Sequence, residues 1–185
     1  MKKVLESKNL QQGYTLLEVL VATGIIGILL VVSSAIFINT IRSTNKANIL
    51  TEARENSALV ADTLKRDVRK VSSEAGSVSV SADGLTLTLV TIEGARNWVC
   101  VAESSGNNGY ITRNGKTLTN KDPFTGVSWS NPNPQKSCYF SIFGSGENIL
   151  VNFFYTLTEG ASAHTAGQDL GVILEQEVSV STRGF

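Results

Sequence analysis

The amino-acid sequence predicts an α+β fold in which a long N-terminal helix packs on a C-terminal domain of antiparallel β-strands. Three observations support this prediction. An apolar run, Tyr14–Ile38, carries a single charge, and a mixed segment with helical periodicity follows it. Alternating apolar and polar residues, separated by turn signals, make up most of the remainder. We therefore divide the 185 residues into a leader (1–13), an apolar transmembrane half of the helix (14–38), an amphipathic half (39–72) and a β-rich globular domain (73–185).

The composition restricts the class of function. The chain has 16 basic and 16 acidic residues, so its formal net charge is zero. A neutral chain has no bulk electrostatic attraction for nucleic acid or anionic membranes. Outside the apolar run the sequence is rich in Ser, Thr, Asn and Gly, which is typical of an extracytoplasmic domain of strands and loops.

Cys100 and Cys138 are the two cysteines of the chain. An even number of cysteines outside the cytoplasm favours a disulfide. The loop-entropy estimate for this bridge is about 3–4 kcal/mol. Two buried free thiols are the alternative.

The apolar run is long enough to cross a membrane. As a helix it spans about 37 Å, against a hydrocarbon core of about 30 Å. In the leader, Lys2, Lys3 and Lys8 outnumber Glu6, and a positive flank stays on the cytoplasmic side. Glu18 lies inside the run, where a carboxylate costs about 2.5–3.5 kcal/mol near the bilayer centre and less near the end. Because a carboxylate in a membrane-spanning segment costs free energy, its presence at position 18 indicates a functional role.

Three interpretations of the N-terminal segment follow. In a secretory signal peptide, Ser33-Ser34-Ala35 is the cleavage site, but the run exceeds the usual core of about 7–15 residues and contains Glu18. In a plain membrane anchor, Glu18 snorkels to the interface. In the third, cleavage after Gly13 frees the α-amino group of Tyr14. That amine then pairs with Glu18 of the same chain or of a neighbouring subunit, where the pair also sets axial register.

The third interpretation explains both the Gly before the run and the Glu five residues after it. The segment Gly-Tyr-Thr-Leu-Leu-Glu-Val-Leu-Val-Ala, residues 13–22, resembles the processing site of type IV prepilins and type II secretion pseudopilins. The resemblance implies cleavage between Gly13 and Tyr14 by prepilin peptidase, N-methylation of Tyr14, and an assembly role for Glu18. Family members usually have Phe where this chain has Tyr14. The resemblance also implies a pilin-like lollipop shape.

Helical periodicity continues beyond the apolar run. An apolar stripe at spacings of three and four comprises Leu50, Ala53, Ser57, Val60, Leu64, Val68 and Val71. The pattern ends at Ser72–Gly76, with Gly76 as the expected C-cap. A continuous helix from Tyr14 to Val71 is about 85 Å long.

The charged run 64–70 is interpreted as mainly a solvated face. Its element Arg66-Asp67-Val68-Arg69 resembles the J-type minor pseudopilins and the W-type minor pilins, which favours a minor subunit.

The C-terminal domain is expected to be one antiparallel sheet that packs a face on this stripe. Asp83-Gly84 and Asn114-Gly115 are hairpin signals. Asp122–Lys136 and Glu159–Gly171 are expected to be irregular loops. The expected strands are Ser77–Ser81, Leu85–Ile92, Asn97–Ala102, Tyr110–Arg113, Lys116–Thr119, Ser137–Phe143, Ile149–Leu157 and Val172–Thr182.

The sequence shows no motif for catalysis, so we expect no enzyme, no cofactor and no metal site. His164 is the only histidine, and no metal-ligand spacing surrounds it. Glu175 and Glu177 share one face of an expected strand. A Ca²⁺-binding pair there is an alternative that strand spacing alone supports weakly.

Arg113, Lys116 and Lys121 surround the Asn114-Gly115 hairpin, near Tyr110. A solvated hairpin tip is the favoured interpretation, and contact with DNA phosphates is the alternative.

The function implied by the resemblance is a minor pilin or pseudopilin of a type IV pilus-like or type II secretion filament, acting in initiation or tip assembly. The implied partners are other subunits, prepilin peptidase, membrane lipid before assembly and, indirectly, an assembly platform protein and ATPase. The implied location is the cytoplasmic membrane, with the N-terminus inside and the globular domain outside, and then the pilus or pseudopilus. The alternative is a single-pass anchored extracytoplasmic binding module, with DNA as one ligand.

Overall fold

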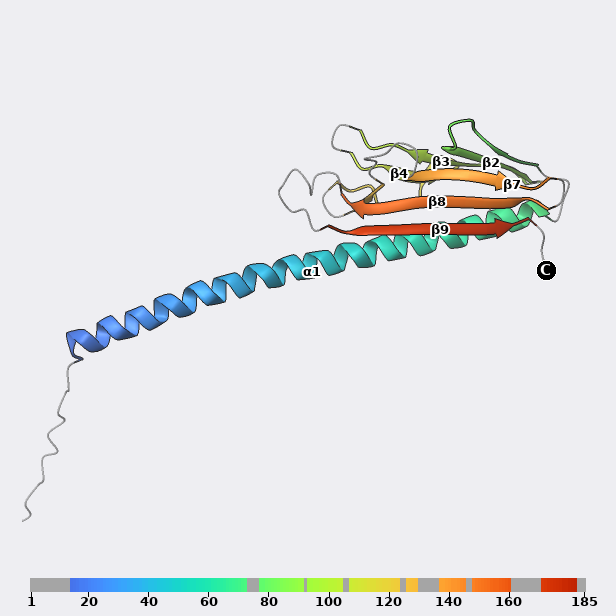
Figure 1. Ribbon diagram of the computed structural model, residues 1–185. Helices are drawn as coiled ribbons and strands as arrows, with labels where there is room; N and C mark the ends of the chain where they lie inside the picture. The colour runs from blue at the N-terminus through green and yellow to red at the C-terminus, as the bar shows by residue number, and fades with distance from the viewer. Residues whose placement is uncertain are drawn as a thin grey trace, which may run out of the picture. The chain divides into compact units, whose positions relative to one another are not determined.

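The computed structural model describes residues 14–72, 77–91, 93–104, 107–123, 126–129, 137–145, 148–160 and 171–182. One helix and nine strands lie within these residues (Figure 1). The chain divides into two compact units, Met1–Ser43 and Thr44–Phe185. The helix α1, Leu16–Ser72, begins in the first unit and ends in the second. The predicted α+β class, a long N-terminal helix with antiparallel strands, is confirmed.

The second half of α1 buries one face against the strands. Ala53, Val60, Leu64 and Val68 are completely buried, as the predicted stripe requires. At the start of the stripe Ile49 is buried, whereas Leu50 is only half-buried. The helix ends at Ser72, as the loss of periodicity predicted. The expected C-cap, Gly76, lies outside the described residues.

The first sheet is a meander in which each strand pairs antiparallel with the next one along the chain. Its third strand begins three residues before the expected Asn97, and its fifth ends two residues before the expected Thr119. The five strands are β1 (Ser77–Val80), β2 (Thr86–Thr91), β3 (Gly94–Val101), β4 (Tyr110–Arg113) and β5 (Lys116–Thr117).

The second sheet is built around the longest strand, β8 (Leu150–Glu159), with β7 (Cys138–Phe143) and β9 (Ile173–Ser181) on its two sides (Figure 1). The short strand β6 (Val127–Ser128) pairs with the end of β8. β6 lies inside the segment expected to be an irregular loop. We expected one sheet, but the described strands form two, because β6, β7 and β9 all pair with β8 and with no strand of the meander.

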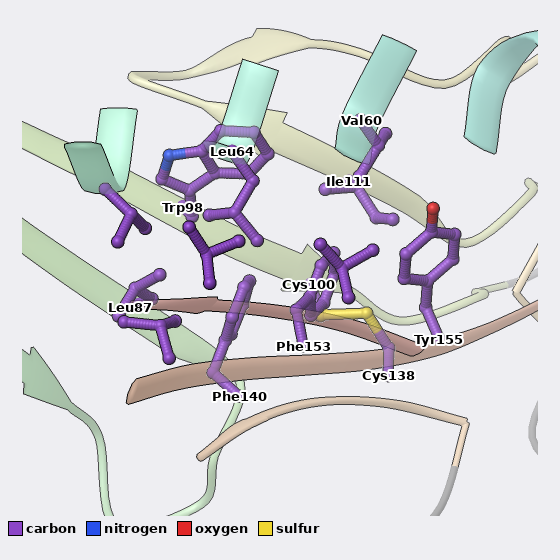
Figure 2. Close-up of a cluster of buried hydrophobic side chains, with 14 of the residues drawn as sticks. Val60, Leu64, Leu87, Trp98, Cys100, Ile111, Cys138, Phe140, Phe153 and Tyr155 are labelled. Carbon is purple, nitrogen blue, oxygen red and sulfur yellow. A yellow bond between two sulfur atoms is a disulfide. The ribbon is translucent and has the colours of Figure 1, made fainter. Parts of the chain in front are cut away.

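The core lies where the two sheets and the helix meet. Figure 2 shows side chains from the helix (Val60, Leu64) together with aromatic side chains from the strands. The disulfide Cys100–Cys138 joins β3 of the first sheet to β7 of the second, with 6.1 Å between the Cα atoms. The predicted pairing of the two cysteines is therefore confirmed, and both residues are buried.

Both predicted hairpin turns are present. Asn114 and Gly115 have φ angles of 49° and 76°, and positive φ at both positions is what a type I′ turn requires. Gly84, in the turn between β1 and β2, has a φ of 74°. Its carbonyl accepts the N–H of Phe140 at 2.7 Å, which is a second link between the two sheets.

Candidate assembly site and helix-docking contacts

The helix begins with a side-chain cap. Thr15 precedes the first helical residue, and its Oγ1 accepts the backbone N–H of Glu18 at 3.2 Å. A Thr followed three residues later by Glu is the sequence of a capping box. Glu18 lies in the first turn, where a carboxylate interacts favourably with the helix dipole. Gly13 and the predicted leader lie outside the described residues. Tyr14, which follows the predicted cleavage site, is 81% exposed.

The first unit presents a helix whose apolar side chains have no cover. All side chains from Tyr14 to Ala47 are exposed. The helix is long and apolar enough to cross a membrane, although a signal sequence passes the same test. Hydroxyl groups within it bond back to the helix: Thr23 Oγ1 donates to the carbonyl of Val19 at 3.0 Å, and Ser34 Oγ to that of Leu30 at 2.8 Å. Such bonds satisfy polar groups in a medium without water.

Gly24 and Gly27 lie in this exposed half. A Cβ at either position would have no atom within 4 Å. The chain's own packing therefore does not require glycine there, and a requirement must come from a neighbouring helix or from helix flexibility.

In the second unit, Asp67 fixes the end of the helix to the first sheet. Its carboxylate is buried and accepts Nε and Nη2 of Arg113 on β4 at 2.6 and 2.7 Å. It also accepts the indole N–H of Trp98 on β3 at 3.0 Å. The bond to Asp67 raises the pKa of the Arg113 guanidinium, against the opposing effect of its partial burial. A buried carboxylate with three charge-assisted or indole donors is fully engaged by the fold.

A second contact ties the middle of the helix to the second sheet. The Tyr155 hydroxyl donates to the carbonyl of Ser57 at 3.0 Å, and Ser57 Oγ lies 2.9 Å from the same hydroxyl. Because Tyr155 has one proton to donate, Ser57 Oγ is the donor of the second bond. Burial raises the pKa of Tyr155, and the bond from Ser57 partly opposes the rise.

A third contact uses Asn56, the residue before Ser57, and Glu52, which lies one turn before Asn56. Asn56 Oδ1 accepts the backbone N–H of Asn120 at 3.0 Å, and Asn120 Nδ2 donates to Glu52 Oε1 at 3.1 Å. Asn56 Nδ2 in turn donates to the carbonyl of Glu52. This polar contact holds the segment after β5 against the helix.

The three cations of the possible DNA contact do not form one surface. Arg113 is committed to Asp67, and only Lys116 shares a groove with it. Lys121 lies instead 5.7 Å from the centre of the Tyr110 ring and lines a separate cavity of about 580 Å³. DNA contact stays a prediction, and its three residues lie on two separate surfaces, Arg113 and Lys116 on one and Lys121 on the other.

The remaining candidate residues that the structure describes, Glu175 and Glu177, do not form a metal-binding cluster. Glu175 and Glu177 are exposed on one face of β9. Among the described residues, no group of three or more His, Cys, Asp or Glu side chains is placed to hold a metal ion. His164 lies outside the described residues.

Sequence reasoning missed the inward direction of Asp67 and its partner Trp98. One signal was available: Asp67 follows Leu64 by three residues and precedes Val71 by four, which places it beside the apolar stripe. Arg66 and Arg69, in contrast, are exposed as expected.

Together, the capped and exposed apolar helix and the antiparallel sheets on its second half define a pilin-like α+β protein. Residues 8–34 match the family model described as the prokaryotic N-terminal methylation motif. The chain thus carries the motif of the type IV pilin and pseudopilin family, whose members are substrates of prepilin peptidase and generally non-enzymatic structural subunits. No curated protein and no solved structure matches the chain.

Proposed function

We propose that this chain is a minor pilin or minor pseudopilin that acts in initiation or tip assembly of a type IV pilus-like or type II secretion filament. The observation that carries the proposal is the methylation motif at the start of an exposed apolar helix. A helix with no cover of its own needs lipid before assembly and neighbouring helices afterwards. The motif supplies the step between the two, which is removal of the leader.

In this proposal, prepilin peptidase cleaves between Gly13 and Tyr14 and the new N-terminus is methylated. Tyr14 and Glu18 are then four residues apart, at the start of α1. The cationic amine and the Glu18 carboxylate offset each other's cost in an apolar bundle, and pairing between subunits sets their axial register. The N-terminus begins on the cytoplasmic side and the globular domain on the other side.

The minor role is supported by the element Arg66-Asp67-Val68-Arg69, which resembles J-type and W-type subunits. Its two middle residues and its two end residues have different environments. Asp67 and Val68 are buried against the strands, whereas Arg66 and Arg69 face outward. The element therefore holds the globular domain and presents cations to a neighbour.

An anchored binding module would use the same apolar helix, but that function gives no reason for a glycine at position 13 and a glutamate at position 18.

Mass spectrometry of the membrane-extracted chain tests the proposal. We expect a mature N-terminus at Tyr14 with the added mass of a methyl group. An intact Met1, or cleavage near Ala35, contradicts the pilin interpretation. Gly13→Leu is the control, and it should leave the leader attached while the chain still inserts.

A further inference from the structure

Charge is unevenly distributed over the globular domain, although the chain as a whole is neutral. Residues 137–182, which include β7, β8 and β9, contain five acidic residues and no Lys or Arg. A groove of about 550 Å³ between α1 and the β4–β5 hairpin has the opposite character. Four cationic residues and one carboxylate line it, namely Arg66, Lys70, Arg113, Lys116 and Asp67.

The floor and the rim of this groove differ. On the floor, the Arg113–Asp67 pair neutralises itself. On the rim, Arg66 is 69% exposed and paired with Asp62, and Lys70 is 52% exposed and paired with Glu93. Exposed pairs of this kind contribute little to stability, so they exchange readily for a carboxylate of a partner. Lys116 is exposed on the same rim.

The groove also has an apolar side. Leu59, on α1, is 48% exposed, and the half-buried Leu118 also lines the groove. A nucleic-acid backbone would meet the cations and leave Leu59 uncovered. A protein segment with an apolar residue beside carboxylates matches both parts of the groove.

The β9 strand presents such a segment. Ile173, Glu175 and Glu177 alternate along its outward face and are all exposed, Ile173 by 66%. Alternate strand residues are about 7 Å apart, so Ile173 and Glu177 are about 13 Å apart. On the helix, Leu59 and Arg66 are separated by about 10 Å along the axis. An apolar contact between Ile173 and Leu59 therefore places both carboxylates within reach of the rim cations.

We propose that β9 of one copy of this chain docks in the groove between α1 and the β4–β5 hairpin of a second copy, through Ile173, Glu175 and Glu177. The proposal rests on the proposed assembly function and names the contact between globular domains. Because the two surfaces differ, the contact is heterologous: one copy contributes β9 and the other copy contributes the groove.

Site-specific photo-cross-linking of the full chain tests this contact. With Leu59→p-benzoylphenylalanine in detergent-extracted, processed protein, we expect cross-links to the peptide that contains residues 173–177. Lys116→Glu, or Glu175→Lys together with Glu177→Lys, should lower the yield by about fivefold, and added salt should lower it as well. Lys121→Glu, an equal charge change outside the groove, should leave the yield unchanged.

Mixing two variants excludes a folding defect as the explanation. A copy with the photo-reactive residue and Lys116→Glu should regain cross-links when mixed with a copy carrying Glu175→Lys and Glu177→Lys. The proposal is overturned if cross-links map elsewhere, if both charge reversals leave the yield unchanged, or if added duplex DNA is captured instead. The N-terminal mass of the same samples separates the two proposals, because a processed chain without the cross-link contradicts only the docking contact.

Discussion

Asp67 on the helix and Arg113 on β4 form a two-pronged ion pair, with Arg113 Nε and Nη2 2.6 and 2.7 Å from the carboxylate oxygens. The two residues are 46 positions apart. The indole of Trp98 donates to the same carboxylate. The last turns of the helix are thereby fixed to two strands of the first sheet by a carboxylate that is almost completely buried.

Arg113→Ala should destabilise the globular domain strongly. The change leaves the Asp67 carboxylate buried with only Trp98 as a donor, and stranding a buried charge in this way costs about 2–4 kcal/mol when one partner was partly exposed. Urea unfolding, followed by the fluorescence of the two buried tryptophans, Trp98 and Trp129, measures the loss. Arg66→Ala is the matched control, because its pair with Asp62 is about two-thirds exposed on both sides and should contribute less than about 0.5 kcal/mol.

The double variant Asp67→Asn, Arg113→Met distinguishes a stranded charge from lost packing. If the cost of Arg113→Ala comes from the unpaired carboxylate, removing that charge as well should recover part of the stability. The explanation is contradicted if the double variant loses at least as much free energy of unfolding as Asp67→Asn and Arg113→Met lose together when each is measured singly.

The strands were predictable from sequence because local patterns encode them. Alternation places β2, and a two-residue turn with positive φ at Asn114 and Gly115 fixes the β4–β5 hairpin. The two-sheet arrangement was not predictable in the same way. It depends on β8 pairing with β6, β7 and β9, and β6 has only two residues, too few for an alternating pattern.

The residues of the candidate site also differ in whether local sequence or distant contacts determine them. Tyr14, Glu18 and the methylation motif are local, so the sequence alone indicates them. Asp67 was expected on a mainly charged, solvated face, because its burial depends on Trp98 and Arg113, which lie 31 and 46 residues further along the chain. The strands that cover the helix decide which charged side chain of residues 64–70 is buried.

The disulfide should be a large contributor to stability, because it joins two sheets that are otherwise connected by few strand-to-strand bonds. Cys138→Ser, or reduction, opens a loop closed over 38 residues and should cost about 3–4 kcal/mol. Chemical denaturation of oxidised and reduced protein gives the difference. Because both sulfurs are buried, we expect reduction to require unfolding. Rapid reduction of the native domain, with no change in its unfolding midpoint, would be the opposite result.

Alkaline pH should destabilise the domain through Tyr155. Burial raises the pKa of Tyr155 above the ordinary value of 10.0. The folded state therefore keeps this proton more tightly than the unfolded state. Its contribution to stability is complete below about pH 10 and is lost as the pH rises toward the folded pKa.

Urea midpoints measured between pH 8 and pH 11 test this effect. Tyr155→Phe should flatten the alkaline fall while costing about 1 kcal/mol at neutral pH through the lost bond to Ser57. Ser57→Ala should steepen the fall, because the bond from Ser57 lowers the pKa of Tyr155. An unchanged alkaline fall in Tyr155→Phe would assign it to other groups.

Glu18→Val should be inserted and cleaved as usual, yet fail to enter the filament efficiently. The helix cap uses the backbone N–H of Glu18 and the Thr15 hydroxyl, so the helix start survives the substitution. What is lost is the carboxylate that we propose pairs with the mature N-terminus. Comparing the N-terminal mass with the amount of subunit in sheared filaments separates processing from recruitment.

Two further variants serve as controls. Glu18→Gln should assemble as poorly as Glu18→Val, whereas Thr15→Val should weaken only the helix cap, by about 1 kcal/mol. Normal assembly of Glu18→Gln would show that the charge is not what recruits the subunit.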